Sequence, residues 1–319
     1  LHLISTDSAT IISISVILLI AYFSFNIKNF KSQYLHYIII LLFTYDYYRI
    51  DKEIINPTLH LPHKEISKST SYLEKYLYED QMIKTLKSDT SKFRIYDYLN
   101  QGNRWSIFGI ESINGYHPAK LDNYNKFIEN IQIRGYELWP EGILELLNIK
   151  YLVLPNNKFN HNSFTNLGNL ETTFFGNNLT YDGKLINVNL YYYKNCLNRV
   201  FFTNRIEYVD VDKIYNLIIS EQYDPVDVVY LIGNENNYVF DDSNRSVKLT
   251  SWSPNEIKFN TFSTSGQFLV VSEVFYNEGW SLCRDGVEHE ILEVNNLVRG
   301  INIPKGQHNF TMRFKANDL

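Results

Sequence analysis

Residues 279–286, GWSLCRDG, carry a strong local signal for a β-hairpin. Asp285 and Gly286 stand between two strand-like runs, and a two-residue hairpin loop needs residues that tolerate positive φ at both central positions. The stretch therefore predicts two antiparallel strands. Trp280, at the start of the first strand, is interpreted either as a core residue or as a ring that stacks on a sugar, and the sequence favours the core.

The hairpin lies in a run of short strand-like segments separated by Gly, Pro and Asn turns. Alternation of apolar and polar residues is clearest in the last segment, where Phe310, Met312 and Phe314 share one side. Close spacing of strands with no helix between them is typical of a small sandwich. We therefore expect a C-terminal antiparallel β-sandwich over residues 239–319. Its predicted strands are SVKLTSW, EIKFNTFS, QFLVVSEVFY, SLCR, VEHEILEV, VRGINIP and HNFTMRF.

The preceding segment mixes helical and strand periodicity. Residues 72–87 place apolar side chains at helical spacing, whereas LINVNLYYYKN and RVFFTNRIEYV alternate as strands do. Helices and strands that alternate along a chain indicate an α/β or α+β fold. Residues 61–238 are therefore expected to form a mixed α/β domain.

Two apolar runs near the start predict membrane helices. Residues 10–25, TIISISVILLIAYFSF, carry no charge, and with their neighbours they reach the roughly 18 residues at which a transmembrane helix is the default interpretation. Residues 34–45, YLHYIIILLFTY, are shorter and alone would fit a buried helix. Together the runs predict a transmembrane hairpin within residues 1–60, with helices at about 8–26 and 33–49, and the lipid bilayer as its partner.

The loop between these runs decides the expected orientation. It carries Lys28 and Lys31, whereas residues 1–10 carry no Lys or Arg, so the positive-inside rule places the loop in the cytoplasm. Everything after about residue 50 is then extracytoplasmic, although Arg49 and Lys52 weaken the asymmetry. A signal peptide fits less well, because the first run lacks a basic n-region and a small-residue cleavage site.

Composition sets further bounds on a chain of 319 residues. A mean hydropathy of -0.25 excludes a protein embedded in the membrane throughout, and a net charge of -5 gives no electrostatic footprint for nucleic acid. Cys196 and Cys283 are far apart, and the sequence leaves open whether they pair. No spacing indicates a metal site, no nucleotide or hydrolase motif is present, and the residues alone define no catalytic group and no cofactor.

The stretch SINGYHPAKLDNY, residues 112–124, has the composition of a binding site. Gly115 permits close backbone approach, His117 can act as acid or base, and Lys120 can meet an anion near a helix N-terminus. The alternative is a loop-to-helix junction held by local hydrogen bonds. Arg299 is interpreted as a partner of Glu293 or a loop cap. The residues proposed as ligand-contacting are Tyr116, His117, Lys120, Trp280 and Arg299.

Five stretches carry a resemblance to a known family: SINGYHPAKLDNYNKFIE, ILELLNIKYLVLP, YYYKNCLNRVFF, YDPVDVVYL and LVVSEVFYNEGWSLCRDGVEHEILEVNNLVRGINIPKGQHNFTMRF. In this order they resemble the C-terminal part of YfhO-type bacterial membrane proteins, over about residues 90–319. The family usually has a Tyr-Pro-Gly-Trp turn, and this chain has YNEGW instead. The match is most specific at Ser272-Glu273, Gly279-Trp280, Asp285-Gly286, Asn295, Arg299-Gly300, Pro304, Gly306 and His308.

The resemblance implies a function that the residues alone do not define. Such proteins are multi-pass inner-membrane proteins similar to GT-C glycosyltransferases, which use a polyprenyl-phosphate-linked sugar to modify envelope polysaccharides such as teichoic acids. Their catalytic acid is expected in an early extracytoplasmic loop, upstream of Leu1. This chain is then expected to be an inert C-terminal fragment that recognises the acceptor or supports the membrane core. The alternative is a non-enzymatic, membrane-tethered envelope binding or assembly module.

Overall fold

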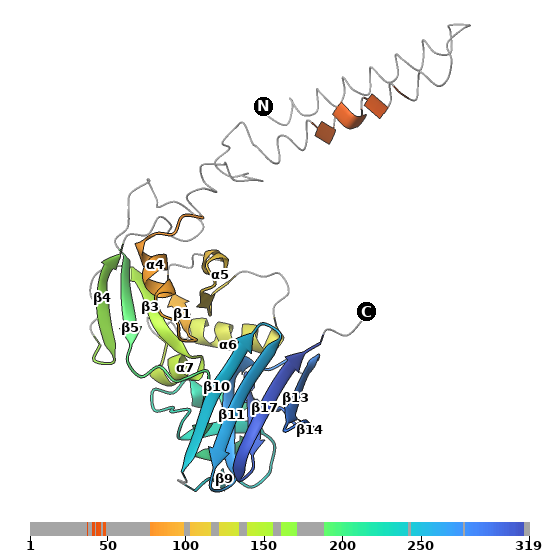
Figure 1. Cartoon of the computed structure of the whole chain (residues 1–319). Helices are drawn as coiled ribbons and strands as arrows, with labels where there is room; N and C mark the ends of the chain where they lie inside the picture. The colour runs from red at the N-terminus through yellow and green to blue at the C-terminus, as the bar shows by residue number, and fades with distance from the viewer. Residues whose placement is uncertain are drawn as a thin grey trace. The chain divides into compact units, whose positions relative to one another are not determined.

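The computed structural model describes residues 37, 40–41, 43–45, 47–48, 77–98, 103–115, 121–133, 139–155, 161–170, 188–241, 244–276 and 278–315. The chain divides into two units, Leu1–Tyr78 and Glu79–Leu319. The helices and sheets that surround the candidate site all belong to the second unit (Figure 1).

The described residues of the first unit between 37 and 48 are helical, and most of them fall in the second apolar run, whereas Leu77 and Tyr78 are not helical. Their large apolar side chains are exposed, Leu41 and Tyr37 to 69% and 68%. No helix within the described ranges is long and apolar enough to cross a membrane. The predicted span at about 8–26, and most of the one at 33–49, lie outside the described residues, so both spans stay predictions.

A five-stranded mixed sheet forms the first layer of the second unit, in the order β2-β1-β3-β5-β4. Strand β1 is parallel to both of its neighbours, whereas β5 is antiparallel to β3 and β4. The bounds are β1 (Arg94–Asp97), β2 (Glu111–Ser112), β3 (Ile149–Pro155), β4 (Phe164–Leu170) and β5 (Val188–Tyr193).

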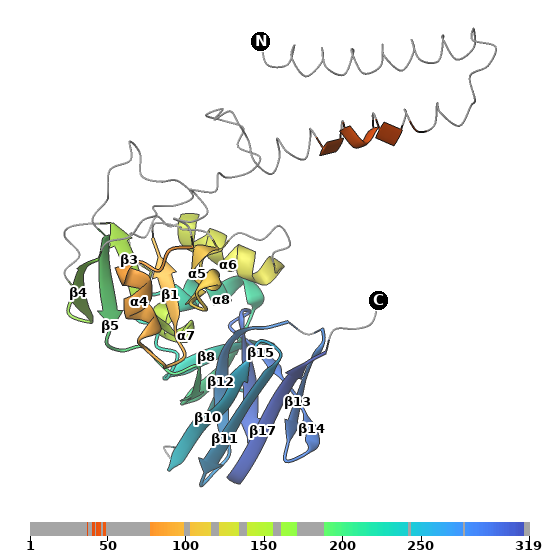
Figure 2. The same cartoon turned by 45° about the horizontal axis from the view of Figure 1, so that its top comes forward.

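Helices cover both faces of this sheet (Figure 2). Alternation along the strands separates two cores, because successive strand side chains point to opposite faces. Ile95 packs with α4 and α5, whereas the next residue, Tyr96, packs with α6 and α7. The helices are α4 (Gln81–Lys87), α5 (Arg104–Ile107), α6 (Asp122–Ile133) and α7 (Glu141–Leu146).

A small three-stranded sheet follows, in the order β8-β7-β9. Strands β7 (Arg205–Val209) and β8 (Val228–Ile232) are parallel and are connected through α8 (Val211–Ile218), while β9 (Tyr238–Val239) pairs antiparallel with β7. A parallel pair needs such a crossover, since a tight turn can only join antiparallel strands.

Two antiparallel sheets then form the β-sandwich. The first has the order β10-β11-β17-β13-β14 and the second β15-β16-β12-β6. Apolar side chains from both sheets share one core, for example Phe259 and Phe310 with Leu269. The bounds are β6 (Val200–Thr203), β10 (Arg245–Ser253), β11 (Glu256–Ser263), β12 (Gln267–Val274), β13 (Trp280–Arg284), β14 (Val287–His289), β15 (Leu292–Val294), β16 (Val298–Ile303) and β17 (Gly306–Phe314).

The α+β character predicted from the sequence is confirmed, as is the hairpin. Strands β13 and β14 pair with Arg284 opposite Val287, and the two residues between them have φ of 51° and 86°. One carboxylate oxygen of Asp285 accepts the backbone N–H of Asn309 at 2.9 Å, and the other lies 2.7 Å from His308 Nδ1. The turn is thus fixed to the neighbouring strand β17. The domain boundaries at residues 60 and 238 stay predictions.

A titrating group lies between α7 and β5. The hydroxyl of buried Tyr193 lies 2.8 Å from Glu145 Oε1 and 3.0 Å from Glu141 Oε2. One hydroxyl proton serves one acceptor at a time, so the second carboxyl group is best satisfied when it is protonated and donates. Burial raises the pKa of Glu145 to about 7, helped by the charges of Asp224 and Glu141 and opposed by the Tyr193 hydrogen bond. Glu141 also accepts from the Ser163 hydroxyl at 2.6 Å.

We expect this group to make stability depend on pH. The folded pKa of Glu145 is raised from 4.5 to about 7, so its contribution is complete below about pH 4.5 and is lost as pH rises through 7. Glu145→Gln, which keeps the neutral form, should reduce the loss of unfolding free energy between about pH 5 and about pH 8 by roughly 1–2 kcal/mol. Urea unfolding at both pH values measures this difference.

The control is Glu221→Gln, at an exposed position just after α8. It should leave the pH dependence as in the unsubstituted chain. Equal pH profiles for Glu145→Gln and the unsubstituted chain would contradict the assignment of the proton to Glu145.

Candidate functional site

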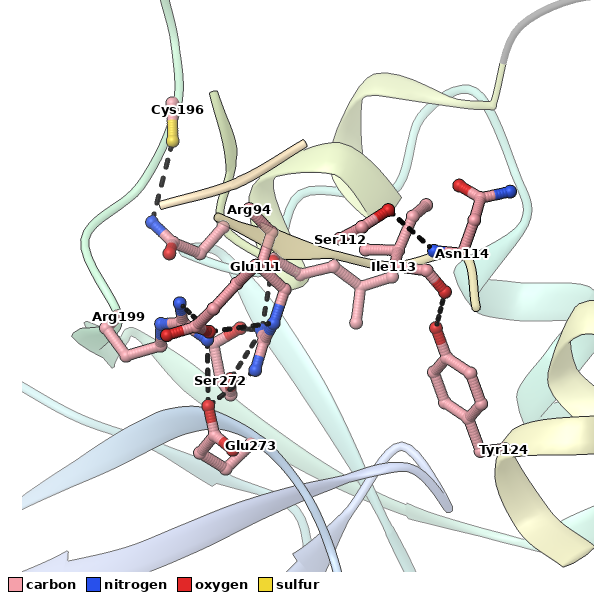
Figure 3. A network of polar contacts seen from close by, with 12 residues as sticks. Arg94, Glu111, Ser112, Ile113, Asn114, Tyr124, Cys196, Arg199, Ser272 and Glu273 are labelled. Carbon is pink, nitrogen blue, oxygen red and sulfur yellow. Dashed lines mark hydrogen bonds and ion pairs between the residues drawn. The ribbon is translucent and has the colours of Figure 1, made fainter. Parts of the chain in front are cut away.

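Two arginines and two glutamates meet where the mixed sheet adjoins the sandwich (Figure 3). Arg199 Nη1 donates to Glu273 Oε1 at 2.8 Å, and its Nη2 donates to Glu111 Oε2 at 2.7 Å. Arg94 donates to the same oxygen of Glu273, and its Nε lies 3.8 Å from Glu111 Oε2. Opposite charges therefore alternate around a closed ring, which we call the junction cluster.

The arginines of the junction cluster are largely withdrawn from water, whereas the side chains of Glu111 and Glu273 are 36% and 22% exposed. The side chain of Arg199 is 1% exposed and that of Arg94 13%. Burial lowers the pKa of Arg199, with the charge of Arg94 acting in the same direction and Glu273 and Glu111 acting against it. A buried guanidinium without a carboxylate partner is strongly destabilising. The two glutamates are therefore what allows this charge to stay buried.

An irregularity in β12 brings Glu273 to the cluster. The register between β12 and β16 shifts between Val271 and Val274, so Ser272 and Glu273 lie in an irregular part of the strand, as at a β-bulge. Arg94 Nη1 donates to the backbone oxygen of Ser272 at 2.7 Å, and the backbone N–H of Ser272 donates to the backbone oxygen of Arg199 at 2.8 Å. Bulges re-aim side chains in this way, and they are common beside functional sites.

A third arginine extends the charged region within the sandwich. Arg299 lies over the ring of Trp280, with its guanidinium carbon 4.1 Å from the ring centroid, and its Nε donates to the backbone oxygen of Val274 at 3.2 Å. Burial lowers the pKa of Arg299 to about 10, against the opposing charge of Glu273. The ion pair with Glu293, one of the two roles considered for Arg299, does not form, although the two residues are register partners. The aromatic ring, not Glu293, receives this guanidinium.

Two hollows adjoin these charges. A groove of about 360 Å³ between α5 and β2, the α5–β2 groove, includes Arg94 and Glu111 in its wall. A cleft of about 250 Å³ in the sandwich includes Trp280 and Tyr276. The other groove residues are Asn103, Trp105, Ser106, Gly109, Ile110, Ser112 and Asn114.

The site residues predicted from the sequence are only partly described. Tyr116, His117 and Lys120 lie outside the described residues, so their role as ligand contacts stays a prediction. The two ends of the stretch 112–124 are bonded to each other, because the Tyr124 hydroxyl donates to the backbone oxygen of Ile113 at 2.7 Å (Figure 3). Ser112 and Asn114, from the same stretch, line the α5–β2 groove.

Trp280 is half-buried, and one of its partners is Phe314 at 5.5 Å between ring centroids. Packing and ligand contact both remain open to it. The junction cluster was missed from the sequence, and the available signal was charge within apolar strand runs: Arg199 precedes VFF, and Glu273 interrupts QFLVVSEVFY.

The two cysteines and the possible metal ligands were also located in the described ranges. Cys196 and Cys283 are both free thiols, so they do not pair. Cys196 receives a hydrogen bond from Asn148 at 3.6 Å, and burial raises the pKa of its thiol to about 12. No group of three or more His, Cys, Asp and Glu residues within the described part of the chain is placed to hold a metal ion.

Comparison with known proteins connects the sandwich to a family. Residues 234–319 match a protein-family model described as bacterial membrane protein YfhO. The C-terminal part of the chain is a YfhO-family part. No curated protein and no solved structure matches the chain. The YfhO part contributes Glu273, Trp280 and Arg299, whereas Arg94 and Arg199 precede it, so the junction cluster bonds the YfhO part to the sheet that comes before it.

We expect Glu273→Gln to destabilise the second unit strongly. Loss of this carboxylate leaves Arg94 and Arg199 without their shared partner, and breaking a buried ion pair typically costs roughly 3–5 kcal/mol. Urea unfolding of the purified chain, followed by tryptophan fluorescence, measures the difference.

Glu256→Gln is the matched control. Glu256 also pairs with two cations, Arg313 and Lys258, at 2.7 Å each, but their side chains are 66% and 39% exposed. Surface pairs contribute about 0–1 kcal/mol. A similar loss in both variants would show that burial does not govern the strength of the junction cluster.

Proposed function

We propose that this chain is the C-terminal portion of a YfhO-family membrane protein that transfers a sugar from a polyprenyl-phosphate carrier to a polymer of the bacterial cell envelope. Its second unit lies outside the cytoplasm and has no catalytic step of its own. There it recognises the acceptor polymer and supports the membrane domain. The observation that carries this proposal is the match of residues 234–319 to a family of bacterial membrane proteins.

Three structural features support a recognition and support role. The junction cluster pairs Glu273 of the YfhO part with Arg94 of the preceding sheet, and buried Arg199 bridges Glu273 to Glu111, so the two layers can present a fixed surface. Its carboxylates are engaged by guanidinium groups, which favours a structural role for them over proton transfer. The exposed apolar side chains at the described helical positions of the first unit, such as Tyr37, Leu41 and Phe43, suit contact with lipid.

The second candidate function is a non-enzymatic, membrane-tethered module that binds or assembles envelope material. The α5–β2 groove and the Trp280 cleft favour it as much as they favour the first, because binding hollows need no catalytic partner. The two functions differ in whether the longer protein that contains this chain transfers sugar.

Reconstitution distinguishes the two. The longer protein, in vesicles with radiolabelled polyprenyl-phosphate sugars and envelope polymer as acceptor, should label the polymer, whereas this chain alone should not. Turnover by this chain alone would overturn the placement of the catalytic group upstream. Binding of polymer by the longer protein without transfer from any donor would favour the assembly module.

Orientation is tested in intact cells. Ser246, in β10, is exposed, and Ser246→Cys in a Cys196→Ser, Cys283→Ser background should react with a membrane-impermeant maleimide added outside, because the basic loop holds the chain with residues after about 50 outside. Ser32→Cys, in that loop, should react only after permeabilisation. The reverse pattern of labelling would contradict the proposed topology.

A further inference from the structure

We propose that the α5–β2 groove binds a single uncharged sugar ring. The inference deepens the proposed function by naming the class of ligand, and it rests on that function only for the polymer that carries the sugar. It is built from three properties of the groove: its floor, its polar rim and its balance of charge.

The groove is closed from below by buried apolar side chains. Trp105 and Ile110 are 1% and 5% exposed, and the indole N–H of Trp105 donates to Asp97 Oδ2 at 2.7 Å. The N–H is thus engaged inside the protein. Because these two side chains are buried, they close the groove from below, and a ligand gains most of its contacts at the polar rim. The volume of about 360 Å³ lies at the small end of the range of roughly 300–1,000 Å³ for ligand pockets, which fits one ring better than a chain of several.

The rim offers hydrogen-bond donors and acceptors without charge. Ser112 Oγ accepts the backbone N–H of Asn114, which leaves its O–H to donate. Ser106 Oγ donates to the backbone oxygen of Asn103, which leaves lone pairs to accept. The Asn114 carboxamide oxygen accepts the backbone N–H of Asp97 at 3.3 Å, so its amide N–H groups remain to donate. Sugar hydroxyls are both donors and acceptors, and they match a rim of this kind.

The charge of the groove selects against ions. It contains one guanidinium and one carboxylate, Arg94 and Glu111, which cancel. Both already have partners in the junction cluster, since Arg94 donates to Glu273 and Glu111 accepts from Arg199. A phosphate would have to compete with Glu111 for cations, and an amine would have to compete with Arg199. A neutral ligand does not have to displace the partner of Arg94 or of Glu111.

The two walls of the groove are held before any ligand arrives. Helix α5 is held by the buried ion pair between Arg104 and Asp80, 3.2 Å apart. Strand β2 pairs with β1, and its Glu111 accepts from Arg199. A site whose walls are already ordered loses little conformational entropy when it binds, so even a small ligand can gain measurable affinity.

Direct binding tests the proposal. The full chain, purified in detergent, is titrated with the methyl glycosides of glucose, galactose and N-acetylglucosamine, followed by saturation-transfer NMR. At least one should bind with a millimolar Kd, which corresponds to about −4 kcal/mol. Glucose 6-phosphate and glucosamine, the charged comparators, should bind about tenfold more weakly. Absence of binding by all three neutral glycosides, or tighter binding of a charged comparator, would overturn the proposal.

A pair of variants locates the site. Ser106→Trp places an indole in the groove and should weaken binding at least about tenfold. Ile107→Trp adds the same ring at the next residue, which is 49% exposed and outside the groove wall, and should leave binding unchanged. Equal affinities for the two variants would place any sugar site elsewhere.

The two proposals fail separately. Sugar binding lost in Ser106→Trp, with no transfer by the longer protein, would uphold the groove and remove the transferase. Transfer by the longer protein without sugar binding by this chain would support the transferase and overturn the groove as a sugar site.

Discussion

The buried charge of Arg199 is the constraint on which the arrangement of the second unit depends. Its guanidinium lies between Glu111 of the mixed sheet and Glu273 of the sandwich, and it also stacks on Trp252 of the facing sheet at 4.8 Å. Neither carboxylate can leave without exposing an uncompensated charge to an apolar surrounding. Ion pairs, as well as apolar packing, therefore fix the position of the mixed sheet relative to the sandwich.

This constraint shapes the groove next to it. Glu111 both accepts from Arg199 and forms part of the wall, so the position of β2 and the position of the sandwich are linked. Arg94 also lines the groove, and it donates to Ser272 and Glu273 of the sandwich. A groove whose wall residues also serve the junction cluster cannot widen freely. The same bonds that fix the architecture thus define the shape available to a ligand.

Sequence patterns predicted those features that depend on neighbours in the chain. The Asp285-Gly286 hairpin followed from two residues, and the mixed α+β character followed from periodicity. The junction cluster could not be predicted in this way, because Arg94 and Glu273 are 179 positions apart and each is an ordinary charged residue locally. Arg299 shows the same limit: its strand neighbour Glu293 was the obvious partner, yet the ring of Trp280 offered closer contact. For the candidate site, the stretch 112–124 contains Ser112 and Asn114, which line the groove, whereas the ligand contacts predicted in it, Tyr116, His117 and Lys120, lie outside the described residues.

Strand β6 has a consequence for how the family part can exist on its own. Thr203, Phe202, Phe201 and Val200 pair with Phe268 to Val271 of β12, and the match to the family begins only at residue 234. A piece of the chain that began at residue 234 would lack β6. The backbone N–H and C=O groups on that side of β12 would then be unpaired at four residues, Phe268 to Val271, whose side chains are fully buried in the full chain. Such an edge is an open template for another chain. Strand β6, which precedes the family part, therefore protects this edge of β12 from pairing with another chain. The family part is best understood as part of a larger folding unit that includes β6.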